Sequence, residues 1–279
     1  MSALAPHALG EAARRWQPTP AVKATLVLHA ACAIAFVLDP AGWPWILALL
    51  AGNHAALMAA SLCPRSQALG RALVRLPRAA ADRGEVALTF DDGPDPDVTP
   101  RVLDLLDRHR VKATFFCVGS KVRAYPEIVK DIVRRGHAVE NHSDGHVHAF
   151  AMLGPWRAAR EITAAQDAIE AIAGVRPRLF RPPMGFRNPW LDPLLAKLGL
   201  SAVAWSRRGL DTVRRDARAV TRALTHDLEA GDVLLLHDGG CGRTDGGEPM
   251  VLAVLPAVLE TLERRGLASV ALRTALQSH

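Results

Sequence analysis

Two adjacent carboxylates, Asp91 and Asp92, stand where a short buried segment meets a turn. They follow the apolar run 86–88, which is typical of a buried strand, and Gly93-Pro94 ends that run with a turn. Charged groups at the mouth of a buried strand are costly to desolvate unless a metal ion or a cation compensates them. The pair therefore predicts either a polar strand end that caps the next helix or one side of a metal site.

Two histidines four residues apart, His142 and His146, follow another short apolar segment at 137–140. This spacing puts both imidazoles on one side of a helical turn or tight loop, so they can share one metal ion. With Asp92 they would form a set of two histidines and one carboxylate, which leaves coordination positions open for water and substrate. His148 is a spare candidate ligand at a less suitable spacing. The alternative is a pair of surface or hydrogen-bonded histidines.

Three further segments carry ionisable residues in the same way. Each of these segments follows or ends a short apolar run. With the two segments above, five strand ends carry charged groups, and a need for solubility does not readily explain so many. In α/β barrels the active site is assembled at the carboxyl ends of the strands, and the pattern is what that rule would produce. The three segments are Phe180–Gly185, Ala204–Thr212 and Val233–Gly239.

The elements that would position these residues alternate between strands and helices, which predicts βα units around a parallel sheet. From spacing alone, an open doubly wound sheet is also possible. Strands are expected at 85–90, 113–117, 137–140, 179–181, 201–205, 232–237 and 268–272. Helices are expected at 100–108, 121–135, 157–172, 193–198, 217–228 and 251–265.

Taken in order, the five segments resemble the motifs of the polysaccharide deacetylases, the NodB-homology or carbohydrate esterase family four enzymes. The resemblance runs from about Glu85 to about Leu272 and leaves out the first eighty or so residues. It implies an α/β fold, a distorted (β/α)7 barrel, and hydrolysis of an acetamide on an amino sugar. Because amides are poor electrophiles, it also implies one divalent metal ion, with Zn²⁺ as the default and Co²⁺ or Ni²⁺ as alternatives.

The resemblance also implies a role for each motif residue. Asp92, His142 and His146 would be the metal ligands. Asp91 would be the general base that takes a proton from the attacking water. Arg181 matches the arginine of the family motif and would hold Asp91 by a charge-assisted hydrogen bond.

The proton donor and the oxyanion site follow from the same family pattern. His237 would protonate the leaving amine, and Asp211 is the carboxylate placed to raise the pKa of His237. The backbone N–H of Met184 would help to bind the oxyanion. Met184 stands where the family usually has Tyr or Trp, and Arg208 where many members have Asp. Since aromatic residues make up only 5% of the chain, the sequence favours a small or lipid-linked sugar over a long polymer.

Two apolar segments at 24–38 and 43–62, joined by a turn at 39–42, predict a helical hairpin in a membrane. The first is short for a span, which needs about 20 residues, unless residues 21–23 join it. A soluble hairpin packed on the barrel and an uncleaved signal-like anchor are the alternatives. The resulting division is a tail at 1–20, the hairpin at 21–64, a basic linker at 65–84 and the catalytic domain at 85–279.

Basic residues flank the hairpin on both sides, whereas its connecting turn has none. Arg14, Arg15 and Lys23 precede it, and five arginines between 65 and 83 follow it. The positive-inside rule then puts both ends and the catalytic domain in the cytoplasm, at a bacterial-type inner membrane, with the periplasm as the alternative. The net charge of +6 is spread along the chain with few aromatics nearby, so no nucleic-acid partner is expected.

The leading interpretation is a metal-dependent hydrolase that removes an N-acyl group from an amino sugar, as a glycan or linked to a lipid, in cell-envelope glycan metabolism. An O-acetyl esterase, or an N-deformylase acting on a lipid-linked sugar, would use the same metal-assisted attack by water. A non-catalytic glycan-binding protein is the alternative from a different class. The complete set of ionisable motif residues argues against it.

Overall fold

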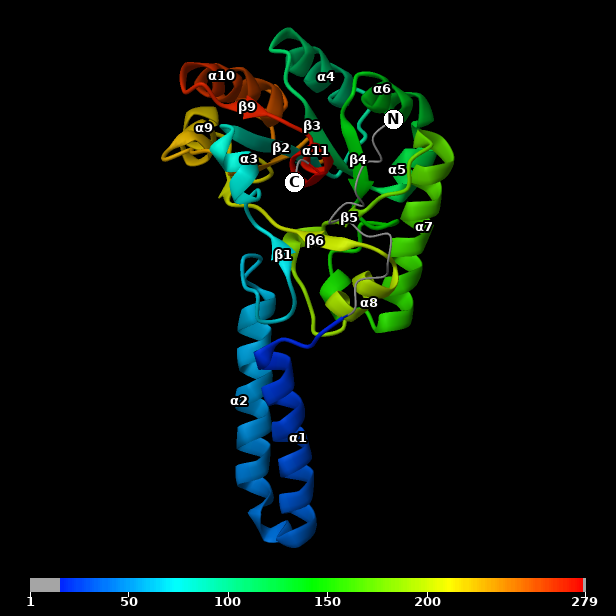
Figure 1. Ribbon diagram of the computed structural model, residues 1–279, viewed down its shortest axis with the longest axis vertical. Coiled ribbons are helices and arrows are strands. Elements are labelled where there is room, and N and C mark those ends of the chain that lie inside the picture. Colours follow the sequence, from blue (N-terminus) through cyan, green and yellow to red (C-terminus); the bar gives the residue numbers. More distant parts are fainter. Residues whose placement is uncertain (1–15, 278–279) are drawn as a thin grey trace, which may run out of the picture.

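The computed structural model describes residues 16–277, which form a helical hairpin joined to a curled α/β domain (Figure 1). Most of the predicted tail, including Arg14 and Arg15, lies outside the described residues. The predicted distorted barrel is confirmed, although its sheet has nine strands where the sequence predicted seven. The strands are β1 (Ala72–Leu73), β2 (Glu85–Asp91), β3 (Ala113–Cys117), β4 (Ala138–Asn141), β5 (Leu179–Phe180), β6 (Ser201–Val203), β7 (Arg207–Arg208), β8 (Val233–His237) and β9 (Ala268–Ser269).

All strand pairs in the sheet are parallel, as the alternation of strands and helices predicted. The order is β1-β6-β5-β4-β3-β2-β8-β7, and β9 pairs with β2. An isolated antiparallel bridge between Arg75 and Asp232 links the segment after β1 to the start of β8, near the opposite margin of the sheet. The sheet therefore curls into an incomplete barrel rather than an open doubly wound layer.

Helices cover the outside of this sheet (Figure 1). The predicted helix at 121–135 is in fact two, because Pro126 lacks an N–H and disfavours a helical conformation at Tyr125, whose φ is −129°. The short α3, α11, β1 and β7 were not predicted. The helices of the domain are α3 (Arg78–Asp82), α4 (Thr99–Arg108), α5 (Gly119–Ala124), α6 (Pro126–Arg134), α7 (Pro155–Ala173), α8 (Leu191–Lys197), α9 (Ala217–Thr225), α10 (Met250–Arg264) and α11 (Leu272–Gln277), with 3-10 turns η2 (Phe150–Met152) and η3 (Pro183–Gly185).

Residues 65–84, predicted as a basic linker, instead contribute two elements to the domain. β1 pairs with β6, so that Ala72 lies opposite Ala202. Leu76 and Ala80 are buried in one hydrophobic cluster with residues of β2, β3 and β8. The linker prediction missed these elements because a two-residue strand has no periodicity that a sequence can display.

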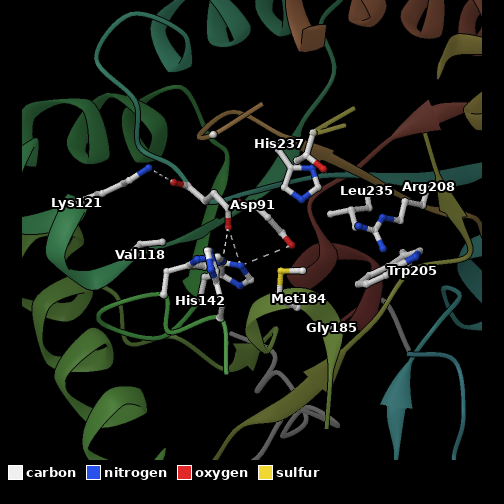
Figure 2. Close-up of a pocket in the computed structure, with 15 residues that line it drawn as sticks. Asp91, Val118, Lys121, His142, Met184, Gly185, Trp205, Arg208, Leu235 and His237 are labelled. Atoms are coloured by element: carbon white, nitrogen blue, oxygen red, sulfur yellow. Dashed lines mark hydrogen bonds and ion pairs between the residues drawn. The ribbon is translucent and has the colours of Figure 1, made fainter. Parts of the chain in front are cut away.

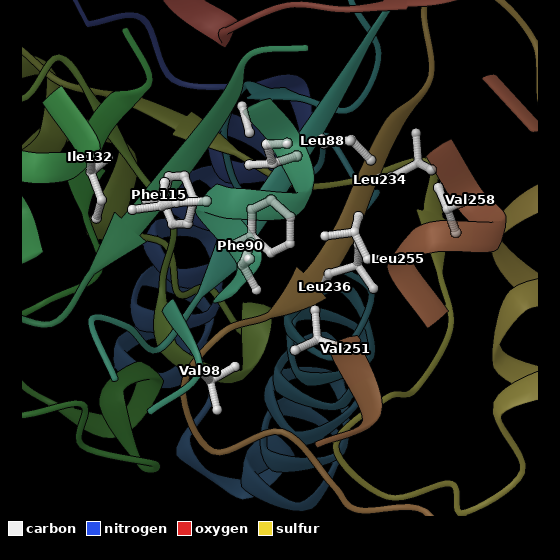
Figure 3. Packing of buried hydrophobic residues seen from close by; sticks show 14 of the residues in the cluster. Leu88, Phe90, Val98, Phe115, Ile132, Leu234, Leu236, Val251, Leu255 and Val258 are labelled. Atoms are coloured by element: carbon white, nitrogen blue, oxygen red, sulfur yellow. The ribbon is translucent and has the colours of Figure 1, made fainter. Parts of the chain in front are cut away.

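Side-chain alternation in β2 decides which of its residues enter the site. Leu88 and Phe90 pack against the outer helices, where Phe90 stacks on Phe115 with 5.0 Å between ring centroids (Figure 3). Because successive side chains of a strand point to opposite faces, Thr89 and Asp91 point into the barrel.

The strand β8 repeats this alternation beside β2. Leu234 and Leu236 join the outer cluster, whereas Leu235 and His237 face the interior and line the cavity there. The parallel register pairs His237 with Asp91. Two ionisable residues therefore leave neighbouring strands at the same level and on the same face.

The hairpin consists of α1 (Pro20–Leu38) and α2 (Trp43–Ser61), joined by a 3-10 turn, η1 (Pro40–Gly42). Thr19 caps α1 by accepting a hydrogen bond from Val22 N, so residues 21–23 do join the first helix. At about 1.5 Å per residue, each helix is roughly 28 Å long, close to the thickness of a bilayer core. Both are long and apolar enough to cross a membrane, and only 6% and 0% of their apolar windows are buried against protein.

Hydrogen bonds tie the base of the hairpin to the loop after η3. The buried guanidinium of Arg187 donates to the carbonyls of Gly70 at 3.2 Å, Pro64 at 3.4 Å and Ser66. We call Arg187 and these three carbonyls the Arg187 clasp. Since the clasp sits next to η3, it couples the hairpin to the rim of the barrel.

Candidate active site

Three predicted ligands converge at the carboxyl ends of β2 and β4. The Nε2 atoms of His142 and His146 lie 3.0 and 2.9 Å from Oδ1 of Asp92. Asp92 and His146 have φ values of 70° and 48°, which are costly for residues with a Cβ and are typical of positions held for function. His148, the spare candidate, lies outside this set with its ring against that of His146, 5.5 Å between centroids.

The donor atoms of this set fit a cation. Oδ1 of Asp92 is buried and, within residues 16–277, has no hydrogen-bond partner, although two imidazole nitrogens face it. Nδ1 of His142 lies 2.7 Å from the carbonyl of Arg181, a contact that assigns the ring proton to Nδ1 and leaves the Nε2 lone pair facing Asp92. Lone pairs that converge on one point suit a divalent metal ion such as Zn²⁺.

The charge of Asp92 is well supported. Burial raises the pKa of Asp92, but the two imidazoles beside it, those of His142 and His146, outweigh burial and hold that pKa well below its usual range. Lys121 donates from Nζ to the backbone carbonyl of Asp92 at 2.7 Å, which fixes the loop that carries the carboxylate. The carboxylate is therefore both ionised and positioned before any ligand binds.

Asp91 lies beside the ligands and is held by a buried arginine. Nη1 of Arg181 is 2.7 Å from Oδ1 of Asp91 and 2.9 Å from the hydroxyl of Thr89. The other carboxylate oxygen of Asp91 is 3.9 Å from Nε2 of His142. Both side chains of the pair are almost fully buried, at 4% and 0% exposure, so removing one partner would leave an uncompensated charge.

His237 is paired with a second buried carboxylate, Asp211. Nδ1 of His237 is 2.9 Å from Oδ1 of Asp211, and the backbone N–H of His237 donates to Oδ2 at 2.8 Å. Burial lowers the pKa of His237, but the hydrogen bond and charge of Asp211, with the charges of Asp91 and Asp92, raise it to about 9. His237 is therefore a cation at neutral pH and has a proton to give.

These residues surround a cavity of about 340 Å³ at the mouth of the barrel. Met184 lines it from η3 with a φ of 60°, and its side chain is partly exposed. Trp205 and Arg208 form another part of the wall, with the guanidinium of Arg208 5.4 Å from the indole centroid. Figure 2 shows this wall together with Asp91, His142 and His237.

Sequence reasoning gave no role to Asp238, which supports the site from behind. Its side chain is fully buried and accepts a 2.6 Å hydrogen bond from the hydroxyl of Thr99. Burial raises the pKa of Asp238 to about 7, against the opposing effects of Thr99 and Lys121. A Cβ on Gly93 would collide with this carboxyl group, so Asp238 packs against the turn that follows Asp92. The sequence signal that could have identified Asp238 was its position directly after His237.

Three converging candidate ligand atoms and two buried ion pairs lie at the open end of an incomplete parallel barrel, an arrangement suited to metal-assisted hydrolysis. A sequence profile of the family described as polysaccharide deacetylase matches residues 78–203. The chain therefore has the features of one established family of sugar-modifying enzymes. Comparisons with individual proteins indicate the same family.

The chitooligosaccharide deacetylase of Sinorhizobium fredii is 35% identical over 213 residues, which cover 73% of this chain and 96% of that protein. A peptidoglycan-N-acetylglucosamine deacetylase of Bacillus cereus is 33% identical over 183 residues, or 65% of this chain and 83% of that protein. A family 4 carbohydrate esterase from Streptomyces lividans, solved with acetate, has a TM-score of 0.61 and 35% identity over 69% of this chain and 95% of its own.

The chain belongs to the polysaccharide deacetylase family, carbohydrate esterase family 4. It is therefore a hydrolase of carbon–nitrogen bonds other than peptide bonds, as the sequence predicted. The alternative of a non-catalytic glycan-binding protein is not supported.

Proposed function

We propose that this protein is a metal-dependent deacetylase that removes the N-acetyl group from an amino sugar linked to a lipid. The observation that carries the chemistry is the pairing of Asp91 with His237 on β2 and β8, beside three converging ligand atoms. Relatives named as deacetylases of chitooligosaccharides and peptidoglycan support the choice of an N-acetylated sugar.

The residues divide the reaction between them. Asp92, His142 and His146 would hold a divalent ion, which when bound supplies the Lewis acid that makes an amide reactive. Asp91 accepts a proton from the attacking water, while Arg181 fixes the orientation of the Asp91 carboxylate.

His237 then gives its proton to the amine nitrogen as the carbon–nitrogen bond breaks, which yields acetate and a free amino sugar. The pKa of about 9 keeps His237 protonated until that step. Met184 lines the cavity, where its backbone N–H would stabilise the negative charge that develops on the carbonyl oxygen.

The protonated state of His237 favours amide cleavage over ester cleavage. An amine leaves poorly without a proton, whereas the alkoxide of an activated ester needs none. An O-acetyl esterase or an N-deformylase would use the same residues. The three activities differ in the acyl group that is removed and in the atom, nitrogen or oxygen, that carries it.

The membrane location is part of the proposal. We infer that α1 and α2 lie in a bacterial-type inner membrane and that the catalytic domain faces the cytoplasm. The flanking basic residues support this side, although Arg75 forms ion pairs with Glu229 and Asp232 of the domain and is not free for lipid headgroups. A membrane-embedded hairpin beside the barrel favours a substrate that is itself anchored in the membrane.

The direct test is an activity assay of the full chain, supplied with Zn²⁺ or Co²⁺, on N-acetyl, N-formyl and O-acetyl amino sugars in free and prenyl-linked forms. We expect acetate and a new primary amine from the N-acetyl sugars. Release of acetate from the O-acetyl sugars alone would show that the protein is an esterase instead.

A further inference from the structure

A second, apolar hollow of about 540 Å³ lies between the hairpin and the catalytic domain. We call it the hairpin groove. Polar residues also line it on both sides, and most of them bond within the protein. On the hairpin, Thr25 donates to Asn53 at 3.0 Å, and Nδ1 of His29 and of His54 contacts a backbone carbonyl. On the domain, Arg187 donates to the carbonyls of the clasp, and Asn188 donates to the carbonyl of Ala151 at 2.8 Å. The apolar walls are formed mainly by Leu26, Leu57 and Met58 of the hairpin and by Met152, Phe186 and Trp190 of the domain.

The hairpin groove adjoins the catalytic cavity. His148 lines both hollows, and its ring lies against the ring of the candidate ligand His146. The chain then passes from one to the other at η3, since Gly185 lines the cavity and the next residue, Phe186, lines the groove. The catalytic cavity and the hairpin groove are therefore neighbours, with His148 in the wall of both.

The domain side of the groove carries apolar side chains that a soluble domain would normally bury. Met152 lines the groove and is 73% exposed, and Trp156, outside the groove at the start of α7, is 85% exposed. Trp190 also lines the groove and donates from its indole N–H to the carbonyl of Leu153 at 3.0 Å. Exposed apolar and tryptophan side chains of this kind are typical of a surface that meets a membrane interface.

We propose that the hairpin groove binds the prenyl chain of a lipid-linked, N-acetylated amino sugar while the sugar occupies the catalytic cavity. The inference rests on the proposed deacetylase function and adds to it a site for the lipid part of the substrate. The groove opens along helices suited to a bilayer core, so a chain of isoprene units can enter it without crossing water. Burial of the chain then supplies affinity that a soluble sugar lacks.

The test compares two substrates that differ only in the lipid, with the full chain in vesicles. One is N-acetylglucosamine joined through a diphosphate to a prenyl chain, and the other carries a methyl group in place of that chain. We expect the wild-type protein to have a kcat/KM at least about 100-fold higher for the prenyl substrate.

The variant Met58→Trp fills the groove, and Leu49→Trp is its matched control. The two positions are nine residues apart on α2, about two and a half turns, and so face opposite sides of the helix. Met58→Trp should lower kcat/KM for the prenyl substrate about tenfold and leave the methyl substrate unchanged. Leu49→Trp should change neither. Met152→Asp, on the opposite and well-exposed wall, gives the same test if Met58→Trp does not fold.

Each failure has its own meaning. If the prenyl chain gives no advantage, or if Met58→Trp and Leu49→Trp behave alike, the groove does not bind the prenyl chain of the substrate and the inference is wrong. Deacetylation of soluble chitotetraose in the same preparation would show that the proposed deacetylase activity still stands, although its preference for a lipid-linked sugar does not. If the metal-supplied wild type deacetylates none of these sugars, both proposals fail.

Discussion

At the scale of single residues, Asp91 and Asp92 are neighbours in the chain with different surroundings. Asp92 faces two imidazoles, whereas Asp91 faces Arg181. We therefore expect Asp91→Asn to lower kcat by about 10² to 10⁴ while the bound metal is kept. His142→Ala should lose the metal together with the activity.

Elemental analysis of both variants, alongside their kinetics, checks this division of roles. A chelator should abolish wild-type activity, and added Zn²⁺ or Co²⁺ should restore it. Wild-type turnover in Asp91→Asn would show that another group is the base. Full activity in a chelator, with no metal in the purified protein, would exclude the metal role.

The pair His237–Asp211 predicts the alkaline limb of the pH profile. We expect His237 to act as the cation, so activity should be present below its pKa of about 9 and lost as the pH rises through that value. Asp211→Asn removes a charge that raises this pKa, so the limb should move to lower pH. Asp216→Asn is the matched control, since Asp216 only caps α9 and Asn is an equally good cap.

A second measurement separates catalysis by His237 from a structural role. His237→Ala should lose far more activity on an N-acetyl sugar than on an activated acetate ester, whose leaving group needs no proton. An alkaline limb that stays in place in Asp211→Asn, with equal losses on both substrates in His237→Ala, would contradict the assignment.

At the scale of elements, the segment before β2 predicts where the chain can be shortened. A deletion of residues 1–62 removes the hairpin but keeps β1 and the carbonyls of the Arg187 clasp. We expect this form to be soluble, folded and active on a small soluble sugar. A deletion of residues 1–77 also removes β1 and the buried Leu76, and should lower Tm by about 5 °C or more relative to the shorter deletion.

Thermal unfolding of the two shortened forms, followed by circular dichroism, decides this prediction. Equal Tm values would mean that β1 contributes nothing to the stability of the barrel. Aggregation of both shortened forms would mean that the hairpin is needed to fold the domain.

The long elements and the site could be predicted from the sequence because their signals are local. The strand at 113–117 was predicted at its observed bounds. Most of the residues that the motifs singled out line one cavity, and Arg181 and Asp211 contact two of them, Asp91 and His237. The short strands β1 and β7 could not be predicted from the sequence, because they are defined by pairing with strands that are distant along the chain. The position of Asp238 depends on contacts with Thr99 and Gly93, which no local pattern encodes.

At the scale of the whole molecule, the hairpin predicts membrane association. The full chain should fractionate with membranes, and a reporter fused after residue 279 should behave as cytoplasmic. Protease treatment of sealed vesicles distinguishes the two sides. An exported reporter would overturn the proposed orientation, and a full chain recovered in the soluble fraction would overturn the membrane hairpin.

With α1 and α2 in a bilayer, the Arg187 clasp sets the reach of the enzyme. On a long flexible tether, a catalytic domain would sample sugars far out along a glycan. Held at its base, this one meets only the sugars next to the lipid. Acetyl groups would then be removed while each glycan is short. The positions of the free amines in the finished glycan would therefore depend on the order in which its sugars are added.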